Sequence, residues 1–341
     1  MLRLFQRKRN LSKKRRRRLF LFWLIALILV GAALTNLFRL MKDFVSSLNT
    51  PTGTVLTFDK FEGEKITGII VANPLILAVY DPAVQKVDLF ELPQNLYLAV
   101  PEKGFFQAGK VYNLVEEDGD GAKLLTTSIF SNFLIPVDFY FAPLNKDFDQ
   151  AKILEIKDKI STPASIFWIT KIPNSAQILK TNFTLFDQFK LFWKLRKVRK
   201  DKFNYQTVPQ ENFEELILPN GDKVVKVSED GITPDFAKVF QDLKVAREAS
   251  TIGVLNATKI SGLGQKVVEI CQNLGGQCEV LGDAEERLPA TKILAKPSFL
   301  NSPTAKRLVK TFGGKIEKQS QETFQDFIVL AGEDLAEKLI F

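Results

Sequence analysis

An uninterrupted run of uncharged, mostly apolar residues covers positions 19–38. A helix rises about 1.5 Å per residue, so a run of this length spans roughly 30 Å, the thickness of a bilayer's hydrocarbon core. Four arginines at 15–18 precede the run, and Arg39 and Lys42 follow it. The pattern predicts a transmembrane helix over residues 19–40, with everything after it on one side of a membrane.

Beyond residue 55 the chain changes to short apolar runs separated by turn residues. Runs rich in β-branched and aromatic residues predict strands. These strands cover 65–72, 75–80, 86–92, 97–100, 137–142 and 165–170. Apolar residues at helical spacing predict helices. These helices cover 121–133, 148–159 and 184–200.

Residues 210–250 are less regular than the segments on either side. A strand is predicted at 223–227, after a Pro-Asn-Gly-Asp turn. A helix is predicted over 234–249, with Thr233 as its cap and Pro234 at its first position.

Residues 251–341 alternate regularly between strands and helices. The predicted strands cover 251–255, 277–282, 291–295 and 327–331, and the predicted helices cover 262–274 and 302–312. Each helix is followed by a pair of glycines, which end helices well. This order predicts a compact α/β domain.

Together the patterns predict an α/β protein with an N-terminal transmembrane helix, a mixed-sheet α/β/α domain and a small α/β C-terminal domain. The predicted parts are a basic tail at 1–18, a signal anchor at 19–40, a juxtamembrane linker at 41–54, a first domain at 55–210, a connecting segment at 211–250 and a second domain at 251–341.

The positive charge of the chain is concentrated in its first 18 residues. The formal net charge is +8, and residues 1–18 hold ten Lys or Arg and no acid. Removing those ten leaves 37 Lys or Arg against 39 Asp or Glu. A basic tail before an apolar run holds the N-terminus in the cytoplasm. The charge therefore indicates topology, and an arm that binds nucleic acid or lipid is the alternative.

A cleaved signal peptide is the alternative to an anchor. The apolar run exceeds the usual h-region of about 7–15 residues, and residues 35–40 lack a clear small-x-small cleavage pattern. These features favour an uncleaved anchor. They predict a single-pass protein of the cell membrane, with a cytoplasmic N-terminus and the bulk of the chain outside the cytoplasm.

The chain has no histidine and two cysteines, Cys271 and Cys278. The lack of histidine excludes imidazole general bases, Ser-His-Asp triads and most zinc or non-haem iron sites. Outside the cytoplasm the two cysteines are able to form a disulfide if their Cα atoms lie within about 7 Å. Two separate small buried residues are the alternative.

A motif in the last block carries a family resemblance. Residues 254–258 (VLNAT) lead to residues 261–264 (SGLG) at the start of a helix, and the closing strand is followed by an acidic-Leu pair. The arrangement resembles the LytR C-terminal domain, although Ala257 and Gly264 replace the glycine and alanine usual there. The resemblance covers 251–337 and implies an extracytoplasmic, envelope-associated domain.

The same motif supplies candidate binding residues. Asn256 and Thr258 fit a strand-to-helix turn, where short polar side chains bond to the backbone. Ser261 and Gly262 precede a helix N-terminus, a place where anions bind. Capping and tight packing explain the same residues, so a ligand site and a structural turn both remain open. A lone Gly-x-Gly does not indicate a dinucleotide site.

Several motifs in residues 66–210 carry a second, weaker resemblance. They are VYDP at 79–82, FELPQNLYL at 90–98, GKVYN at 109–113 and IPVDFY at 135–140. They are similar to motifs of the LytR–CpsA–Psr domain. That family transfers glycopolymer from a polyprenyl pyrophosphate lipid to peptidoglycan, with an arginine, an aspartate and Mg²⁺. The resemblance places Gln94 and Asn95 where the family has its Arg-Asp pair.

The two replacements keep roughly the shape of the family's pair and lose its charge. Phosphoryl transfer depends on cations around the phosphate and carboxylates on the metal, and neutral amides supply neither at full strength. The sequence therefore predicts a degenerate domain in which Gln94 and Asn95 are not catalytic, with no metal and no cofactor.

An active glycopolymer–lipid phosphotransferase is the alternative. It would use Mg²⁺ and displaced carboxylates, Asp88, Glu91 or Asp138, together with Lys110. Lys110 is also a candidate for attracting an anionic polymer, and a solvated surface lysine is the simpler interpretation.

Residues 186–202 combine aromatic side chains with seven Lys or Arg. Such a segment is able to lie on an anionic membrane or to bind a teichoic-acid-like polymer. Because it falls inside a domain-like pattern, the sequence favours a domain helix with its aromatic stripe in the core.

The sequence thus predicts a membrane-anchored, extracytoplasmic envelope protein that is not an enzyme. Its expected partners are cell-wall polymer, a polyprenyl-linked lipid or an envelope protein. A transferase is the alternative, and a regulator is a third possibility. The 18 residues before the apolar run contain no DNA-binding helix pair, so no nucleic acid partner is expected.

Overall fold

The computed structural model describes residues 61, 63–115, 121–143, 155, 179–319 and 323–339. These residues belong to one compact unit, Pro51–Phe341. The predicted tail, anchor and linker, most of the predicted helix at 148–159 and the predicted strand at 165–170 lie outside them. Within the described ranges, no helix is both long enough and apolar enough to cross a membrane.

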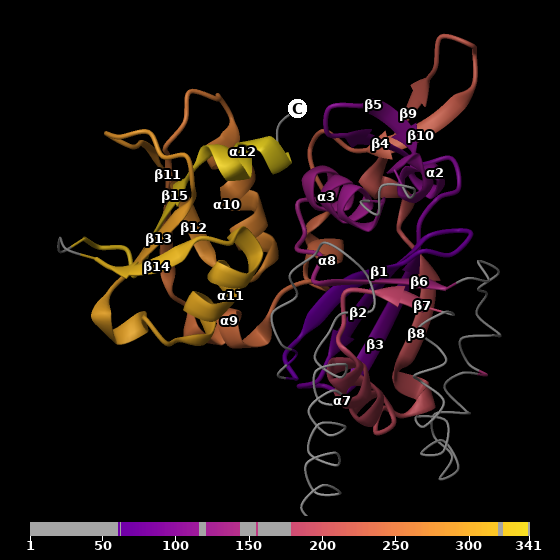
Figure 1. Ribbon diagram of the computed structural model, residues 1–341, viewed down its shortest axis with the longest axis horizontal. Coiled ribbons are helices and arrows are strands. Elements are labelled where there is room, and N and C mark those ends of the chain that lie inside the picture. Colours follow the sequence, from indigo (N-terminus) through magenta and orange to yellow (C-terminus); the bar gives the residue numbers. More distant parts are fainter. Residues whose placement is uncertain are drawn as a thin grey trace, which may run out of the picture. The chain divides into compact units, whose positions relative to one another are not determined.

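A six-stranded mixed sheet forms the centre of the first domain (Figure 1). Its strands are, in sheet order, β7 (Leu179–Thr181), β6 (Phe139–Pro143), β1 (Ile66–Ile70), β2 (Ile76–Asp81), β3 (Lys86–Glu91) and β8 (Phe203–Thr207). Strands β1, β2 and β3 form an antiparallel meander, and β6 and β8 join its two edges in parallel.

Both faces of this central sheet are buried, because apolar residues alternate between them along each strand. On β2, Leu77 and Val79 enter one core while Ile76 and Ala78 enter the other. The first core is covered by α3 (Gly121–Phe133) and by the hairpin of β4 (Tyr97–Val100) and β5 (Gly104–Gln107), which leads into α2 (Ala108–Val111) and a 3₁₀ turn. Helix α7 (Leu185–Leu195) packs on the second core.

Residues 211–250, expected to be a connecting segment, pack largely against the first domain. They form the antiparallel pair β9 (Phe213–Ile217) and β10 (Lys223–Val227), then α8 (Pro234–Ala237) and α9 (Leu243–Glu248). Val225 makes a parallel bridge to Leu96, and Phe236 and Phe240 lie in the first core.

The prediction of one helix over 234–249 was wrong. The chain forms two short helices, because Phe240 is drawn into the core after the first and Asp242 caps the second by accepting a hydrogen bond from the Lys244 N–H. Pro234 occupies the first turn of α8 as predicted, but the Thr233 side chain makes no capping hydrogen bond.

The C-terminal domain is built on a five-stranded mixed sheet. In sheet order its strands are β12 (Gln277–Asp283), β11 (Thr251–Asn256), β15 (Phe327–Ala331), β13 (Lys292–Ala295) and β14 (Lys315–Lys318). The β13–β15 pair is antiparallel and the other pairs are parallel. Helices α10 (Leu263–Asn273), α11 (Pro303–Phe312) and α12 (Glu333–Leu339) cover it.

The C-terminal core extends into the first domain. Phe130 and Leu134, at the end of α3, belong to the same buried cluster as Val267 of α10 and Leu335 of α12. The Asn273 side chain also donates a 2.9 Å hydrogen bond to the Leu134 carbonyl. The α/β class predicted for both domains and the mixed sheet predicted for the first are therefore confirmed, and the two domains share an apolar seam.

Candidate functional site

The turn that carries Gln94 and Asn95 is held by its backbone. The Gln94 carbonyl accepts a 2.7 Å hydrogen bond from Gln107 Nε2, and the Asn95 carbonyl accepts one of 3.1 Å from the Val225 N–H. Both side chains are exposed. The turn between β3 and β4 is thus fixed in place, but it presents two neutral amides to solvent.

Two carboxylates of the catalytic alternative, Asp88 and Glu91, lie on opposite faces of the first sheet. They are three residues apart on β3, and successive side chains alternate between the two faces of a sheet. Asp88 accepts a 2.8 Å hydrogen bond from Asn204 and pairs with Lys86. Glu91 accepts a 2.8 Å hydrogen bond from the Tyr205 hydroxyl on the other face.

Asp138 is buried in an ion-pair network with the C-terminal domain. Its oxygens lie 2.9 and 3.3 Å from the guanidinium nitrogens of Arg307, and one lies 3.7 Å from Lys310 Nζ. The Thr67 N–H donates to it at 2.8 Å. Burial disfavours the charged carboxylate, but these partners outweigh burial and lower the pKa of Asp138 below its ordinary value.

In the part of the chain that the structure describes, metal-binding side chains are sparse around Gln94 and Asn95. Enzymes that act on phosphates commonly hold Mg²⁺ through one or two carboxylates together with water and substrate phosphates. Gln94 and Asn95 carry no carboxylate, and no group of three or more acidic, Cys or His side chains able to hold a metal occurs among the described residues. Lys110 is exposed on α2 and pairs with none of Asp88, Glu91 or Asp138, each of which has another partner.

The turn after β11 satisfies its own polar groups. Asn256 Oδ1 accepts from both the N–H and the hydroxyl of Thr258, and Asn256 Nδ2 donates to the Ile260 carbonyl. The Thr258 hydroxyl also accepts from the Ile260 N–H. Ser261 is exposed, and Gly262 precedes α10 with a φ of 84°, which glycine adopts without strain. These contacts favour the structural turn over a ligand site.

Cys271 and Cys278 are free thiols that lie beside each other. Cys271 is buried in α10, and Cys278 is partly buried on β12. A hydrogen bond to the Cys278 sulfur, together with burial, raises the pKa of the Cys271 thiol. The structure therefore places the two cysteines side by side, as free thiols and without the disulfide that the sequence allowed.

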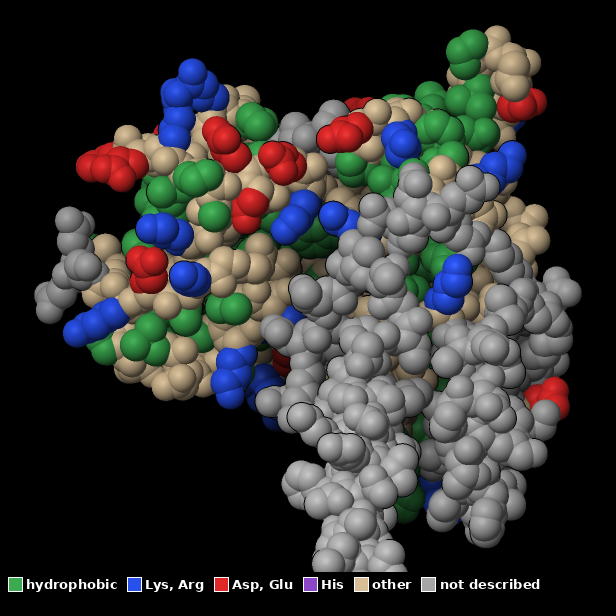
Figure 2. All heavy atoms as spheres, in the orientation of Figure 1, with side chains coloured by type: hydrophobic (Ala, Val, Ile, Leu, Met, Phe, Trp, Pro, Cys, Tyr) green, Lys and Arg blue, Asp and Glu red, His purple; other side chains and the backbone are tan. Residues whose placement is uncertain are grey.

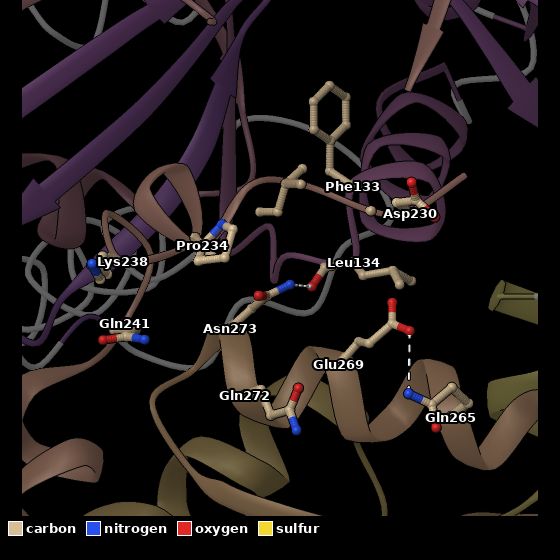
Figure 3. Close-up of a pocket in the computed structure, with 13 residues that line it drawn as sticks. Phe133, Leu134, Asp230, Pro234, Lys238, Gln241, Gln265, Glu269, Gln272 and Asn273 are labelled. Carbon is tan, nitrogen blue, oxygen red and sulfur yellow. Dashed lines mark hydrogen bonds between the residues drawn. The ribbon is translucent and has the colours of Figure 1, made fainter. Parts of the chain in front are cut away.

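A groove of about 430 Å³ lies where residues 230–241 face α10 (Figure 3). Its apolar part comes from the end of α3 and from the loop and helix around α8. Its polar part is dominated by amides and carboxylates. The lining includes Phe133, Leu134, Ile232, Pro234, Ala237, Asp230, Lys238, Gln241, Gln265, Glu269, Gln272 and Asn273.

The polar side of the groove comes mainly from one face of α10. Gln265, Glu269, Gln272 and Asn273 recur at helical spacing, and Gln265 Nε2 lies 3.5 Å from Glu269 Oε1. Asp230 lies opposite (Figure 3). We did not predict these residues from the sequence. The amide-rich polar face of α10 was a visible signal, but nothing in the sequence placed residues 230–241 against it.

On the face of the C-terminal domain drawn in Figure 2, positive and negative side chains are mixed rather than gathered into a patch of one charge. Lys and Arg side chains are interspersed there with Asp and Glu. A dense basic surface is what an anionic polymer would require.

Comparison with protein families finds a match for the C-terminal block of the chain. Residues 249–335 match the family described as LytR cell envelope-related transcriptional attenuator. The resemblance of this block to the LytR C-terminal domain is therefore confirmed. A comparison with curated proteins found no match.

Solved structures resemble about half of the chain at low sequence identity. The structure of B. subtilis TagV is 13% identical with a TM-score of 0.39, and the match covers 52% of this chain and 95% of TagV. TagT bound to LIIa-WTA is 13% identical, with a TM-score of 0.35 and coverages of 52% and 91%. YwtF (TagT), a LytR-CPS2A-psr family protein with bound octaprenyl pyrophosphate lipid, is 12% identical, with a TM-score of 0.33 and coverages of 53% and 91%.

The family match therefore relates residues 249–335 to the cell envelope.

Proposed function

We propose that this protein is a non-catalytic, membrane-anchored scaffold of the cell envelope that binds a neutral glycan of the cell wall. The groove between residues 230–241 and α10 is the observation that carries the proposal. The anchor at 19–40 would hold the groove on the outer side of the membrane. The match of residues 249–335 to an envelope-related family supports this setting.

The lining of the groove suits a hydroxyl-rich polymer. Amide side chains such as Gln265 and Gln272 both donate and accept hydrogen bonds, as sugar hydroxyls require. Apolar residues such as Leu134 and Pro234 offer surface to the less polar faces of a sugar ring.

The charges of the groove favour a neutral ligand over an anionic one. Asp230 and Glu269 both line it, and like charges repel an anionic polymer. Lys238 also lines it, but its ammonium is paired with Asp235 at 2.7 Å. The glycan strands of peptidoglycan fit these requirements better than a phosphate-rich polymer does.

The non-catalytic part of the proposal is supported at the turn after β3. Gln94 and Asn95 offer no charge to a phosphate or a metal. The carboxylates that a displaced mechanism would use, Asp88, Glu91 and Asp138, are each held by separate structural partners.

Co-sedimentation with purified wall sacculi tests the proposal. The detergent-solubilised full chain should sediment with sacculi stripped of anionic polymer. The double variant Gln265→Ala/Gln272→Ala should bind about tenfold more weakly, because each lost amide removes hydrogen bonds worth about 0.5–1.5 kcal/mol.

The matched control is Gln206→Ala/Gln277→Ala, which removes two exposed amides on β8 and β12. It should bind like the unaltered chain. Equal binding by both double variants, or no binding by the unaltered chain, would contradict the assignment of the groove. Equal melting temperatures would show that any difference arises from binding.

A further inference from the structure

Helix α7 presents an aromatic face to solvent. Phe186 and Phe189 are each 39% exposed and Trp193 is 43% exposed. They recur at i, i+3 and i+7, so they share one side of the helix. The opposite side is anchored in the domain, where Asp187 and Leu191 are buried. The sequence favoured burial of this aromatic stripe in the core, and the structure corrects that expectation.

The exposed rings are arranged among cationic side chains. The Phe189 and Trp193 rings stack with their centroids 6.3 Å apart. The Arg196 guanidinium lies 5.6 Å from the Trp193 ring, and Lys190 Nζ lies 4.7 Å from the Phe186 ring. These contacts order a surface that is both aromatic and basic.

The positive charge continues beyond the helix. Residues 186–202 contain seven Lys or Arg and two Asp. Asp187 is buried and bonded within the domain, and Asp201 pairs with Arg199. Lys194, Lys197 and Lys202 are exposed on the same segment. The surface therefore carries a clear positive excess beside its exposed rings.

The described chain begins against this helix. The Phe61 N–H donates to Asp187 Oδ1 at 3.1 Å, and Lys190 Nζ donates to the Phe61 carbonyl at 2.9 Å. Two residues later, a Cβ on Gly63 would lie 3.3 Å from Lys194 Cε. The first described residue, Phe61, therefore lies against α7, and about 20 residues separate it from the end of the predicted anchor at residue 40, a reach of roughly 70 Å at most when extended.

We propose that the exposed face of α7 rests on the anionic headgroup surface of the bilayer. Phe186, Phe189 and Trp193 would insert at the headgroup–acyl boundary, where Trp is favoured, and the neighbouring lysines would contact anionic lipids. Charge complementarity and the position of Phe61 against this helix both point to a lipid surface. This contact orients the domain on the membrane, and it does not depend on what the groove binds.

Quenching of Trp193 by brominated lipids tests the contact. The full chain and its Trp193→Phe variant are reconstituted in nanodiscs of phosphatidylcholine with roughly one third phosphatidylglycerol. The difference between their emissions belongs to Trp193. Brominated lipids should quench that difference about twofold or more, while aqueous acrylamide should quench it weakly, because the ring lies below the headgroups.

Charge reversal tests whether anionic headgroups hold the face of α7 on the bilayer. Lys194→Glu/Lys197→Glu should abolish the lipid quenching, and so should raising the salt from about 0.1 M to about 1 M. The control Lys259→Glu/Lys306→Glu makes the same charge change on exposed positions of the C-terminal domain and should leave the quenching intact.

Three results would overturn the proposal. Strong acrylamide quenching without lipid quenching would leave the face in water. Shielding from both quenchers would mean that a protein surface, either a second copy or a partner, covers the face. Equal lipid quenching in pure phosphatidylcholine would exclude the role assigned to anionic headgroups.

Discussion

The two terminal guanidinium nitrogens of Arg307 donate one hydrogen bond to each carboxylate oxygen of Asp138, although the residues are 169 positions apart in the chain. Both side chains are nearly inaccessible, with 6% and 4% of their surface exposed. Lys310 adds a second cation and pairs with Glu64 at 2.7 Å. The first domain and α11 of the C-terminal domain are therefore joined by a buried polar network as well as by an apolar seam.

Removing one partner of this pair should destabilise the whole compact unit. Arg307→Met leaves a buried carboxylate without its main partner, and such changes cost about 3–5 kcal/mol. Asp138→Asn should cost a similar amount, and the double variant should cost less than the sum, because neither charge is then left uncompensated. Urea unfolding measures these differences.

The exposed pair Lys238–Asp235 supplies the control for that series. Lys238→Met should change the free energy of unfolding by no more than about 1 kcal/mol, because both side chains are largely exposed and their attraction is screened by water. An Arg307→Met variant no less stable than this control would mean that the buried network does not join the domains.

The contribution of Asp138 to the free energy of unfolding should decrease as the pH falls. Its pKa in the folded protein lies below the ordinary value of 3.8, because Arg307 and Lys310 outweigh the effect of burial. The contribution is complete above the ordinary value and is lost as the pH falls through the lower, folded value. The stability gap between the unaltered chain and Asp138→Asn should therefore shrink between about pH 5 and about pH 2.

Urea unfolding at a series of pH values, at one fixed ionic strength, measures this gap. A gap that stays constant over the range, or widens as the pH falls, would show that Asp138 is not held ionised by Arg307.

Gly68 of β1 should not tolerate even one added methyl group. A Cβ at this position would lie 2.5 Å from the Phe139 ring on the neighbouring strand β6. Gly68→Ala should therefore destabilise by about 1–3 kcal/mol through overpacking. Gly109→Ala is a suitable control, since a Cβ on Gly109 meets nothing within 4 Å and the change favours the helix α2. Melting curves that order these two variants the other way would refute the packing assigned to β1 and β6.

The two cysteines should react at different rates. Cys278 is partly accessible, whereas Cys271 is buried and its thiol pKa is raised by its hydrogen bond to Cys278 and by burial. Because the thiolate is the reactive form, iodoacetamide should label Cys278 about tenfold faster or more. Mass spectrometry of peptides from briefly labelled protein measures both rates. Equal labelling, or the absence of any free thiol before reduction, would contradict the structure.

Much of the fold could be predicted from local sequence patterns, because the conformation of many helices and strands is determined by the residues within them. The helix at 121–133 and the strands at 97–100, 223–227 and 327–331 have the bounds expected from their periodicity. Strand β14 was missed because it is a short edge strand with mostly exposed, polar side chains, which do not alternate. The helix expected over 184–200 ends at Leu195, and Val198 beyond it is buried in the second core.

The candidate site was harder to predict because distant segments create it. The sequence offered Asp138 for chemistry, and its buried partner Arg307 could not be foreseen from a separation of 169 residues. The groove has the same origin, since Asp230 and Glu269 meet there only through the packing of two domains. What could be predicted was the neutral character of Gln94 and Asn95, because it is a property of those residue types alone.

One reconstitution tests the central claim, a scaffold that binds wall glycan without transferring polymer to it. The full chain is incubated with sacculi, a polyprenyl-pyrophosphate-linked glycopolymer and Mg²⁺, and both sacculus binding and released polyprenyl phosphates are followed. We predict binding that is weakened by Gln265→Ala/Gln272→Ala, and no release above the protein-free background. Polyprenyl release that requires the protein and is abolished by a single substitution such as Asp88→Asn would contradict the claim.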